Sequence, residues 1–460
     1  MSLIKSISGI RGTIGGKVND NLTPLDVVKF ASAFGTWLQN NKNKKNLTLV
    51  IGRDARISGE MVSSLVTATL QGLGINVVDL GLSTTPTVEI MVPELKADGG
   101  IILTASHNPK QWNALKLLND KGEFITGENG ADVLALAESE DFNYAEVDDL
   151  GKYETRDDAF DIHIQQILDL PMVDAEAIKA KKFKVVLDAV NSTGGIAIPM
   201  LLDKLGCETV KLYCEPNGQF PHNPEPLKEH LGDICELVIK EKADVGVVVD
   251  PDVDRLALID EKGEMFGEEY TLVAVADYLL KHKKGAAISN LSSSRALRDV
   301  ARNHDSEYFA SAVGEVNVVT LMKEKNAVIG GEGNGGIIYP ELHYGRDSLV
   351  GVALFLTHLA KENKTVSELR VGYPAYFMGK KKIELTPEIN VDDILAQMEK
   401  EYQNEEVSTV DGVKIDFANN WVHLRKSNTE PIIRIYTEAS SQAEADALGD
   451  EIIAKIKSLI

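Results

Sequence analysis

The sequence predicts an α/β protein with three similar α/β regions and a smaller C-terminal α+β region. Helical and extended patterns alternate through roughly the first 370 residues, and one strand–loop–helix–strand plan recurs three times within them. Beyond that point short strands follow one another, and a long helix ends the chain. The length of 460 residues independently predicts about three domains, at roughly 150 residues per domain.

The repeated plan places a polar loop between a strand and the helix that follows it. Its first copy has a strand at 49–51, a loop at 52–59, a helix whose apolar face is Met61, Leu65 and Ala68, and a strand at 75–78. The second and third copies have strands at 184–187 and 209–213 around a helix at 201–205, and strands at 287–290 and 307–310 around a helix at 295–302. We expect three sheet edges that favour phosphate, because such loops lie at carboxyl strand ends and helix amino termini.

The C-terminal region follows a different pattern. We expect strands at 381–385, 412–415, 421–424 and 432–436, followed by a helix at 442–459. Strands followed by a helix predict an α+β layer, and therefore a fourth, smaller domain.

The composition excludes several classes of protein. Lys and Arg total 48 whereas Asp and Glu total 70, which makes the formal net charge −22 and disfavours nucleic acid and anionic membrane surfaces as partners. The 43% of hydrophobic and 26% of charged residues are ordinary for a folded soluble protein. Apolar runs such as Val245–Val249 are far shorter than the roughly 20 residues of a spanning helix.

The N-terminal residues and the cysteines indicate a reducing compartment. The first residues lack the charged and apolar regions of a secretory signal. Cys207, Cys214 and Cys235 form no C-x-x-C pair, so we expect idle thiols, no zinc site and a cytoplasmic protein.

The most specific segment is Thr104-Ala-Ser-His-Asn-Pro109, which follows an apolar strand at 100–103. A hydroxyl beside an imidazole at a strand end is a suitable position for a nucleophile. Because Ser, Asn and Pro also form ordinary turns, the residues alone leave a structural turn equally open.

Three carboxylates, Asp250, Asp252 and Asp254, follow an apolar strand at alternate positions. Carboxylates this close repel one another unless a cation neutralises them, and a hard ion such as Mg²⁺ suits oxygen ligands. The alternative is a solvated acidic turn, which the apolar stretch running into it disfavours. Pro251 and Arg255 argue against an EF-hand loop.

Two further loops carry polar groups. Arg425-Lys-Ser-Asn-Thr-Glu-Pro431, with Arg434 three residues on, combines guanidinium, hydroxyl and amide groups that suit phosphate oxygens. Gly330-Gly-Glu-Gly-Asn-Gly-Gly336 carries one carboxylate and one carboxamide that suit vicinal sugar hydroxyls. Each loop alone is also compatible with a plain turn.

In this order, the four loops resemble those of the α-D-phosphohexomutase superfamily, which includes phosphoglucomutase, phosphomannomutase and phosphoglucosamine mutase. The resemblance extends from Ser8-Gly-Ile-Arg-Gly12 to the Arg425 loop. It implies three similar mixed-sheet α/β domains and a smaller C-terminal α+β domain around a central cleft. The domains it implies are residues 1–152 with the phosphoserine, 153–255 with the metal, 256–370 with the sugar loop and 371–460 with the phosphate loop.

The resemblance also implies a role for each loop. Ser106 is the expected phosphorylated nucleophile, and Asp250, Asp252 and Asp254 are expected to hold one Mg²⁺ together with that phosphate. The residues expected around the phosphoserine are Arg11, His107, Lys116 and Arg255. The residues expected to bind the sugar hydroxyls and the distal phosphate are Glu332, Asn334, Arg425, Ser427, Asn428, Thr429 and Arg434.

The activity that the resemblance implies is interconversion of hexose 6-phosphate and hexose 1-phosphate. The phosphoserine gives its phosphoryl group to the sugar monophosphate, and the hexose 1,6-bisphosphate formed, which also acts as an activator, returns its other phosphate to the serine. The partner expected is a small sugar phosphate, with neither nucleic acid nor membrane, and the chain is expected to be a monomer or homodimer.

Some positions depart from the commoner family pattern. Asn334 stands where many members have Ser, and Gly336 where many have His, so the proton acceptor is left open among His107, Lys116 and His343. This loop and Lys110-Gln-Trp-Asn113 are most similar to a subgroup assigned to phosphoglucosamine mutases. Glucosamine 6-phosphate is therefore the first expected substrate, and glucose and mannose phosphates are the alternative.

Two other functions compete with the mutase. A strand ending in Asp-x-Asp also begins haloacid-dehalogenase phosphatases, where Asp250 would be the nucleophile and Asp252 the acid/base, but that interpretation leaves the Ser106 and Arg425 loops without a role. A sugar-phosphate binding protein without catalysis would not need the carboxylate triad. Basic side chains in or beside the loops predict a locally positive site in an acidic protein, namely Arg11, Arg53, Arg56, Lys116, Arg255, Arg425 and Arg434.

Overall fold

The computed structural model describes residues 2–6, 9–42, 44–384, 390–426 and 432–459. The chain forms two compact units, each made of two stretches of sequence. Unit 1 comprises Met1–Thr271 and Asn334–Glu368, and unit 2 comprises Leu272–Gly333 and Leu369–Ile460.

The first sheet of unit 1 is mixed, with strand order β1-β2-β6-β5-β3-β4-β7. Its strands are β1 Ile4–Ser6, β2 Gly9–Thr13, β3 Thr48–Arg53, β4 Asn76–Leu82, β5 Gly99–Leu103, β6 Trp112–Leu118 and β7 Tyr153–Thr155. The helices α1 Pro24–Asn41, α2 Gly59–Gly72 and α4 Gly127–Ser139 share one core with the strand residues that face them, whereas α3 Thr85–Glu94 packs in a second core. Leu49 and Ile51 lie in the first core and Val50 in the second, as the alternation of side chains along a strand requires.

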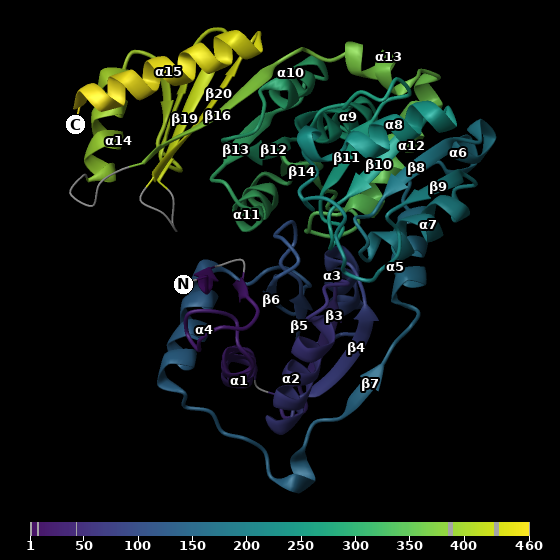
Figure 1. The fold of residues 1–460 in the computed structure, drawn as a ribbon, viewed down its shortest axis with the longest axis vertical. Coiled ribbons are helices and arrows are strands. Elements are labelled where there is room, and N and C mark those ends of the chain that lie inside the picture. The colour runs from purple at the N-terminus through teal and green to yellow at the C-terminus, as the bar shows by residue number, and fades with distance from the viewer. Residues whose placement is uncertain (1, 7–8, 43, 385–389, 427–431, 460) are drawn as a thin grey trace. The chain divides into compact units, whose positions relative to one another are not determined.

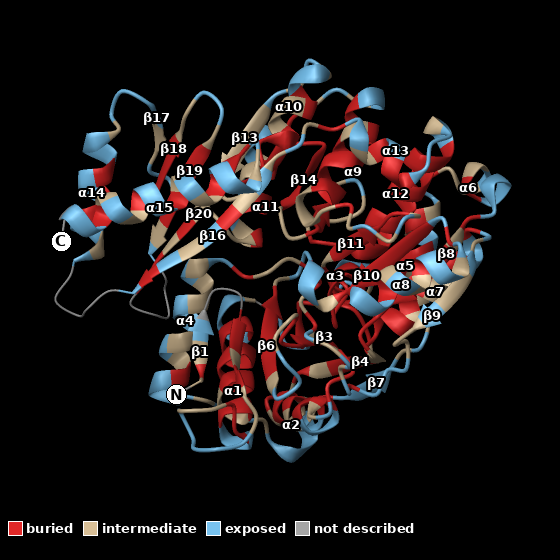
Figure 2. Ribbon diagram, turned by 45° about the horizontal axis from the view of Figure 1, so that its top comes forward, coloured by how far each residue is buried: buried red, intermediate tan, exposed pale blue. Residues whose placement is uncertain are grey.

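The second sheet of unit 1 has the order β11-β10-β8-β9. Its elements are β8 Lys184–Asp188, β9 Glu208–Leu212, β10 Val245–Val249, β11 Leu256–Ile259, α5 Ala159–Leu168, α6 Ala175–Lys181, α7 Gly194–Lys204 and α8 Gly232–Glu241, with the short helices η1 Val147–Asp149 and η2 Lys228–His230. Unit 1 also contains β15 Gly336–Ile338 and α12 Ser348–Glu362. Helix α12 is buried from Ser348 to Ala360 (Figure 2), as expected for a helix that is apolar on all sides.

Unit 2 contains a parallel sheet and an antiparallel one. In the first, β12 Ala287–Asn290 pairs in parallel with β13 Tyr308–Ser311 and with β14 Ile329–Glu332, and α10 Ala296–Asn303 and α11 Glu315–Lys325 pack on it. The second has the order β16-β20-β19-β18-β17 and comprises β16 Phe377–Glu384, β17 Glu406–Ser408, β18 Val413–Asp416, β19 Trp421–Lys426 and β20 Ile432–Ala439. Helices α14 Val391–Glu401 and α15 Gln442–Leu459 cover one face of it (Figure 1). Helices α9 Glu268–His282 and α13 Val366–Val371 contain the points where the chain passes between the units.

The three predicted copies of the repeated plan are confirmed. In each copy the first strand pairs in parallel with the strand after the helix, as β3 with β4, β8 with β9 and β12 with β13. In each copy a third strand, β5, β10 or β14, pairs in parallel on the other side of the first. The expected α/β fold with a C-terminal α+β layer is therefore correct.

The predicted apolar face of the α2 helix is wrong. Met61 and Ala68 are exposed and Leu65 is half-buried, whereas Val62, Val66 and Leu70 form the buried stripe. The buried set is spaced i, i+4, i+8 and begins one residue later than the predicted set, and it places two β-branched side chains and a leucine against the sheet. Sequence spacing alone did not distinguish the two faces.

Two further expectations concern the thiols and the lengths of the helices. Cys207, Cys214 and Cys235 are free thiols, and burial raises the pKa of Cys207 and of Cys214 to about 12, which keeps both in the unreactive thiol form. Within the residues described here, helices are too short or too polar to cross a membrane.

Candidate active site

The serine loop and the acidic turn meet within unit 1. Ser106 follows β5 and Asp250 follows β10, and the Ser106 hydroxyl donates a hydrogen bond to Asp250 Oδ2 at 2.9 Å. Ser106 has a φ of 49°, in the left-handed region, and its N–H donates to Thr104 Oγ1 at 3.0 Å. This strained backbone turns the hydroxyl toward the acidic turn, which is typical of functional positions.

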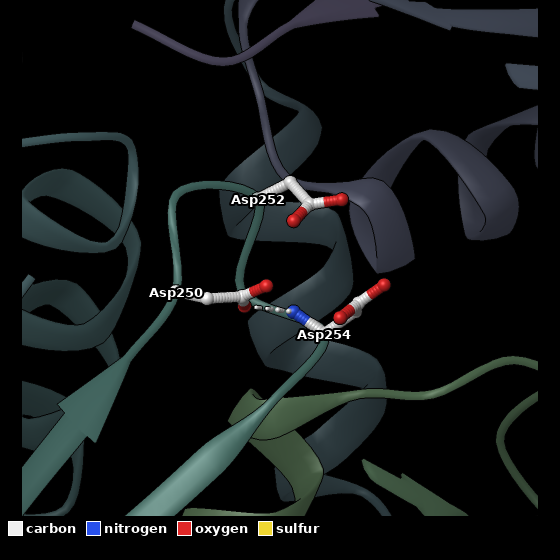
Figure 3. Close-up of side chains that lie close together, drawn as sticks. All are labelled: Asp250, Asp252 and Asp254. Carbon is white, nitrogen blue, oxygen red and sulfur yellow. Dashed lines mark hydrogen bonds between the residues drawn. The ribbon is translucent and has the colours of Figure 1, made fainter. Parts of the chain in front are cut away.

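All three carboxylates of the acidic turn come from the connection between β10 and β11 (Figure 3), and all three are buried. One oxygen atom from each lies within 4.8 Å of the others. Asp250 Oδ1 accepts the N–H groups of Asp254 and Arg255, both at 3.1 Å, so the turn holds its first carboxylate by its own backbone. The sequence prediction that these three residues form one cluster is correct.

Two basic side chains and a hydroxyl contact the other two carboxylates. Asp252 Oδ2 accepts hydrogen bonds from Lys116 Nζ at 2.7 Å and from Thr85 Oγ1 at 2.6 Å. Asp254 Oδ2 accepts one from Arg346 Nη2 at 2.7 Å. The three carboxylates therefore share two cations.

The same contacts determine how the cluster titrates. Burial, followed by repulsion from Asp254 and Asp252, raises the pKa of Asp250 well above its ordinary value. Burial also acts to raise the pKa of Asp252, but the Lys116 ammonium outweighs it and the pKa falls below its usual range. Burial acts to lower the pKa of Lys116, yet Asp252 and Asp254 raise it overall, so this amine stays charged at neutral pH.

The donor set fits a divalent cation. Asp252 Oδ1 and Asp254 Oδ1 are buried and have no hydrogen-bond partner. A buried carboxylate oxygen without a partner is costly, because it has lost its hydration without gaining a compensating contact. Oxygen ligands of this kind match the preference of hard ions such as Mg²⁺.

A buried ion pair holds the serine loop in place. The Arg56 side chain is fully buried, and its Nε donates to Asp54 Oδ2 at 2.9 Å. Its terminal nitrogens donate to four carbonyl oxygens of the loop, those of Ser106, Asn108, Pro109 and Trp112, at 2.5–3.0 Å. Arg56 was predicted to add positive charge at the substrate site, but its donors are instead used by the loop backbone.

The first loops of the three repeats support the loops that carry the candidate site residues. Asp54 accepts a hydrogen bond from Thr104 just before Ser106, Ser192 Oγ donates to the Pro251 carbonyl, and Asn290 Nδ2 donates to Glu332 Oε1. These polar groups contact a neighbouring loop, and the expectation of three phosphate-favouring edges stays a prediction.

The other residues predicted around Ser106 also lie in unit 1. His107 Nδ1 is 3.4 Å from Ser106 Oγ, and burial, followed by the charge of Arg255, lowers the pKa of His107 well below its ordinary value. Arg255 pairs with Glu225 at 3.2 Å. Arg11 lies in β2 opposite Ala114 of β6, the strand that carries Lys116.

His343 lies between two buried carboxylates. Its Nε2 lies 3.3 Å from Asp347 Oδ2 and its Nδ1 lies 3.3 Å from Glu89 Oε2. Burial acts to lower the pKa of His343, but these two carboxylates raise it to about 10. His343 is therefore cationic at neutral pH, and neither it nor Lys116 is available there as the proton acceptor that the sequence left open.

The remaining predicted residues lie in the sugar loop and the phosphate loop. Glu332 is buried at the end of β14 in unit 2, and Asn334 Oδ1 accepts the Gly336 N–H at 3.2 Å in unit 1. Arg425 of β19 lies directly opposite Arg434 of β20. Ser427, Asn428 and Thr429 lie outside the described residues.

Sequence reasoning missed two contacts of the triad, Arg346 and Thr85. Arg346 stands beside Asp347, the N-cap of α12, and Thr85 opens α3 beside its N-cap Thr84. The N-cap residue before each helix can be recognised in the sequence. The sequence does not show that either helix lies beside the acidic turn. A Cβ atom at Gly336 would lie 2.3 Å from Arg346 Cδ, so this glycine leaves room for the arginine.

Comparison with known families gives four matches in chain order. The models described as phosphoglucomutase/phosphomannomutase alpha/beta/alpha domains I, II and III and the C-terminal domain match residues 4–144, 161–263, 267–376 and 382–455. The chain belongs to the phosphoglucomutase/phosphomannomutase family. As the names of its relatives state, enzymes of this family are mutases, and the chain is an intramolecular phosphotransferase.

Relatives of this family member match over almost the whole chain. A Thermococcus kodakarensis protein named phosphoglucomutase/phosphomannomutase is 37% identical, covering 94% of this chain and 95% of its own. A Sulfurisphaera tokodaii phosphoglucosamine/phosphogalactosamine mutase is 33% identical, covering 98% of each. The crystal structure of a phosphoglucomutase/phosphomannomutase family protein from Burkholderia thailandensis superposes with a TM-score of 0.85 at 25% identity, covering 99% of this chain and 98% of its own.

Proposed function

We propose that this family member interconverts hexose 6-phosphate and hexose 1-phosphate through a phosphoserine at Ser106. The observation that carries the proposal is the hydrogen bond from the Ser106 hydroxyl to Asp250 Oδ2, beside two carboxylate oxygens that lack a partner. A nucleophile placed beside carboxylate oxygens that suit a cation fits phosphoryl transfer, which depends on positioning and charge neutralisation.

The proposed reaction has two transfers that balance. In the first, the Ser106 Oγ–P bond breaks and a bond forms from phosphorus to the free sugar hydroxyl oxygen, whose proton is released while Oγ regains one. The hexose 1,6-bisphosphate then reorients. In the second, the other sugar O–P bond breaks and the Oγ–P bond forms again, while Oγ loses its proton and the freed sugar oxygen takes one up.

In this proposal the residues of unit 1 hold the reacting end. Asp250, Asp252 and Asp254 would hold Mg²⁺, which would neutralise these carboxylates and draw charge from a phosphoryl oxygen. Lys116 and Arg346, which contact Asp252 and Asp254, supply positive charge beside the transferred group. His107, Arg11 and Arg255 complete the basic surroundings proposed for the phosphoserine.

The residues of unit 2 are proposed to hold the sugar and the distal phosphate. Lys382, Arg434 and Arg425 form one row across β16, β20 and β19. Like charges opposite one another destabilise a sheet, so a row of three cations favours a bound anion such as phosphate. Glu332 is proposed to bind sugar hydroxyls, as is Asn334, and Ser427, Asn428 and Thr429 are proposed to add phosphate contacts.

We propose glucosamine 6-phosphate as the first substrate, giving glucosamine 1-phosphate. The Sulfurisphaera tokodaii relative, named a phosphoglucosamine/phosphogalactosamine mutase, supports this choice. The Thermococcus kodakarensis relative, named phosphoglucomutase/phosphomannomutase, supports glucose and mannose phosphates as the second candidate. An aspartate-nucleophile phosphatase has no such support, since the chain belongs to a mutase family.

The experiment that tests the substrate compares kcat/KM for the 1- and 6-phosphates of glucosamine, glucose and mannose, with the matching 1,6-bisphosphate present. The highest kcat/KM for glucosamine phosphates supports the first candidate, whereas a preference for glucose or mannose phosphates replaces it with the second. The four domain ranges, a cytoplasmic location and a monomeric or homodimeric state stay predictions.

A further inference from the structure

One carboxylate oxygen in unit 2 has two partners from different parts of the sequence. Asp411 lies in the turn before β18, and its Oδ2 accepts the N–H of Val313 at 2.9 Å. The same oxygen forms an ion pair with Nε of Arg425 at 2.8 Å. Asp411 therefore joins the strand that carries the candidate phosphate-binding arginine to the loop between β13 and α11.

The next amide along that loop contacts the candidate sugar-binding residue. The Gly314 N–H donates to Glu332 Oε1 at 3.1 Å, and Asn290 Nδ2 donates to the same oxygen at 2.9 Å. Gly314 has a φ of 114°, which side-chain-bearing residues rarely adopt. The consecutive backbone N–H groups of Val313 and Gly314 thus contact two carboxylates. One is Asp411, which pairs with Arg425, and the other is Glu332.

A buried histidine fixes the turn that carries Asp411. His423 is fully buried, its Nδ1 lies 2.9 Å from Ser292 Oγ, and its Nε2 lies 2.6 Å from the Asp411 carbonyl oxygen. Burial lowers the pKa of His423 to about 4, so the ring is neutral at physiological pH. A neutral ring satisfies both contacts, because Nε2–H donates to the carbonyl while Nδ1 accepts from the serine.

We propose that Asp411 is a positioning residue that couples the phosphate-binding Arg425 to the sugar-binding Glu332. The proposal rests on the proposed function, which assigns those two residues to opposite ends of one ligand. A carboxylate paired with Nε restricts where the Arg425 guanidinium lies, while its terminal nitrogens suit the oxygens of a phosphate. Because one dipeptide contacts both carboxylates, displacing either end of the ligand site displaces the other, and such coupling is reciprocal.

The first experiment compares two variants of Asp411 with a matched control. Asp411→Asn keeps an acceptor for the Val313 N–H but loses the charge that pairs with Arg425, whereas Asp411→Ala loses both. The control is Asp392→Ala, which removes the exposed partner of the neighbouring Lys426, 3.1 Å away. We expect Asp411→Ala to raise KM for the hexose phosphate about tenfold while kcat changes less, and Asp392→Ala to leave both unchanged.

The second experiment measures the coupling itself. Glu332→Gln and Arg425→Lys are combined, and the dissociation constant of glucosamine 6-phosphate is measured by titration calorimetry in the Ser106→Ala chain. When Asp411 is present, we expect the change in dissociation constant of the double variant to differ about tenfold from the product of the two single changes. In Asp411→Asn we expect the change of the double variant to equal that product. Additive effects in both backgrounds, or equal coupling in both, would overturn the proposal.

The outcomes separate this proposal from the proposed function. If the wild-type chain turns over hexose phosphates and Asp411→Ala behaves like Asp392→Ala, only the coupling is wrong. If the wild-type chain shows no turnover, the proposed function fails, and titration of inorganic phosphate into wild type and Asp411→Asn still tests how Asp411 orients Arg425. Equal phosphate affinity in those two chains would overturn that orientation, and far-ultraviolet circular dichroism checks that each variant is folded.

Discussion

The Ser106 hydroxyl donates a hydrogen bond to Asp250 Oδ2 at 2.9 Å, although the two residues follow strands of two different sheets. Strand β5 ends in one loop and strand β10 in the other, and both strands occupy the same position in their copies of the repeated plan. The proposed nucleophile from one copy and the acidic turn from the next therefore lie in contact within unit 1.

Metal removal is expected to stop turnover. EDTA should abolish mutase activity and Mg²⁺ should restore it, because the three buried carboxylates otherwise repel one another. At about 100 times its dissociation constant, Mg²⁺ should raise the free energy of unfolding by about 2.7 kcal/mol in wild type and by much less in Asp252→Asn. Urea denaturation with and without Mg²⁺ measures this difference.

The control for the metal prediction is Glu264→Gln, since the Glu264 side chain is 70% exposed and lies outside the triad. Its response to Mg²⁺ should match that of wild type. Equal stabilisation of wild type and Asp252→Asn by Mg²⁺ would show that the ion binds elsewhere.

Replacement of Arg56 is expected to harm both stability and catalysis. Arg56→Ala should lower the free energy of unfolding by about 3–5 kcal/mol, because it leaves Asp54 charged and buried without its partner. Arg56→Lys keeps a positive charge but is unable to donate to four carbonyls, so kcat should fall about 100-fold as the Ser106 loop shifts. Urea denaturation and steady-state kinetics measure the two effects.

Arg53 provides the matched control for Arg56. It pairs with Glu60, whose side chain is 85% exposed, so Arg53→Ala should cost about 1 kcal/mol or less. Chemical rescue adds a second check, because free guanidinium at concentrations too low to denature should restore part of the kcat of Arg56→Ala. Wild-type kcat in Arg56→Lys would refute a positioning role for the guanidinium.

Gly336→Ala is expected to displace Arg346. The new Cβ would lie 2.3 Å from Arg346 Cδ, and the guanidinium would have to leave Asp254, which it contacts at 2.7 Å. We expect kcat to fall about tenfold or more, as for loss of one charge-stabilising donor. Gly232→Ala is the control, because a Cβ at Gly232 meets no atom within 4 Å. Unchanged kinetics of Gly336→Ala would contradict a role for Arg346.

Stability is expected to fall at alkaline pH through His343. Glu89 and Asp347 raise the pKa of His343 from 6.5 to about 10 against the opposing effect of burial, and His163 shares Asp347 with it. The folded state therefore binds this proton more tightly, so the stabilisation is complete below about pH 6.5 and is lost as the pH rises toward about 10. Urea denaturation across this range should show a smaller decline in His343→Gln, and parallel curves would contradict the prediction.

The repeated fold was predictable from the sequence because in each copy the spacing of apolar residues changes in the same way from that of a strand to that of a helix. The clustering of Asp250, Asp252 and Asp254 was predictable for a related reason, since one short turn brings them together. The role of Arg56 was not, because its partners are backbone carbonyls, which carry no sequence signal. Asp411 was missed likewise, since its contact with Arg425 depends on register between strands and its contact with Val313 on tertiary packing.

Phosphoryl transfer through Ser106 is tested most directly by intact-mass spectrometry of the chain during turnover. After incubation with hexose 1,6-bisphosphate and Mg²⁺, the wild-type chain should gain the mass of one phosphoryl group, located at Ser106 by peptide mapping, and lose it on addition of hexose monophosphate. Ser106→Ala should gain no such mass and should show no mutase turnover. Retained turnover in Ser106→Ala, or a phosphoryl group on Asp250 instead, would contradict the phosphoserine mechanism.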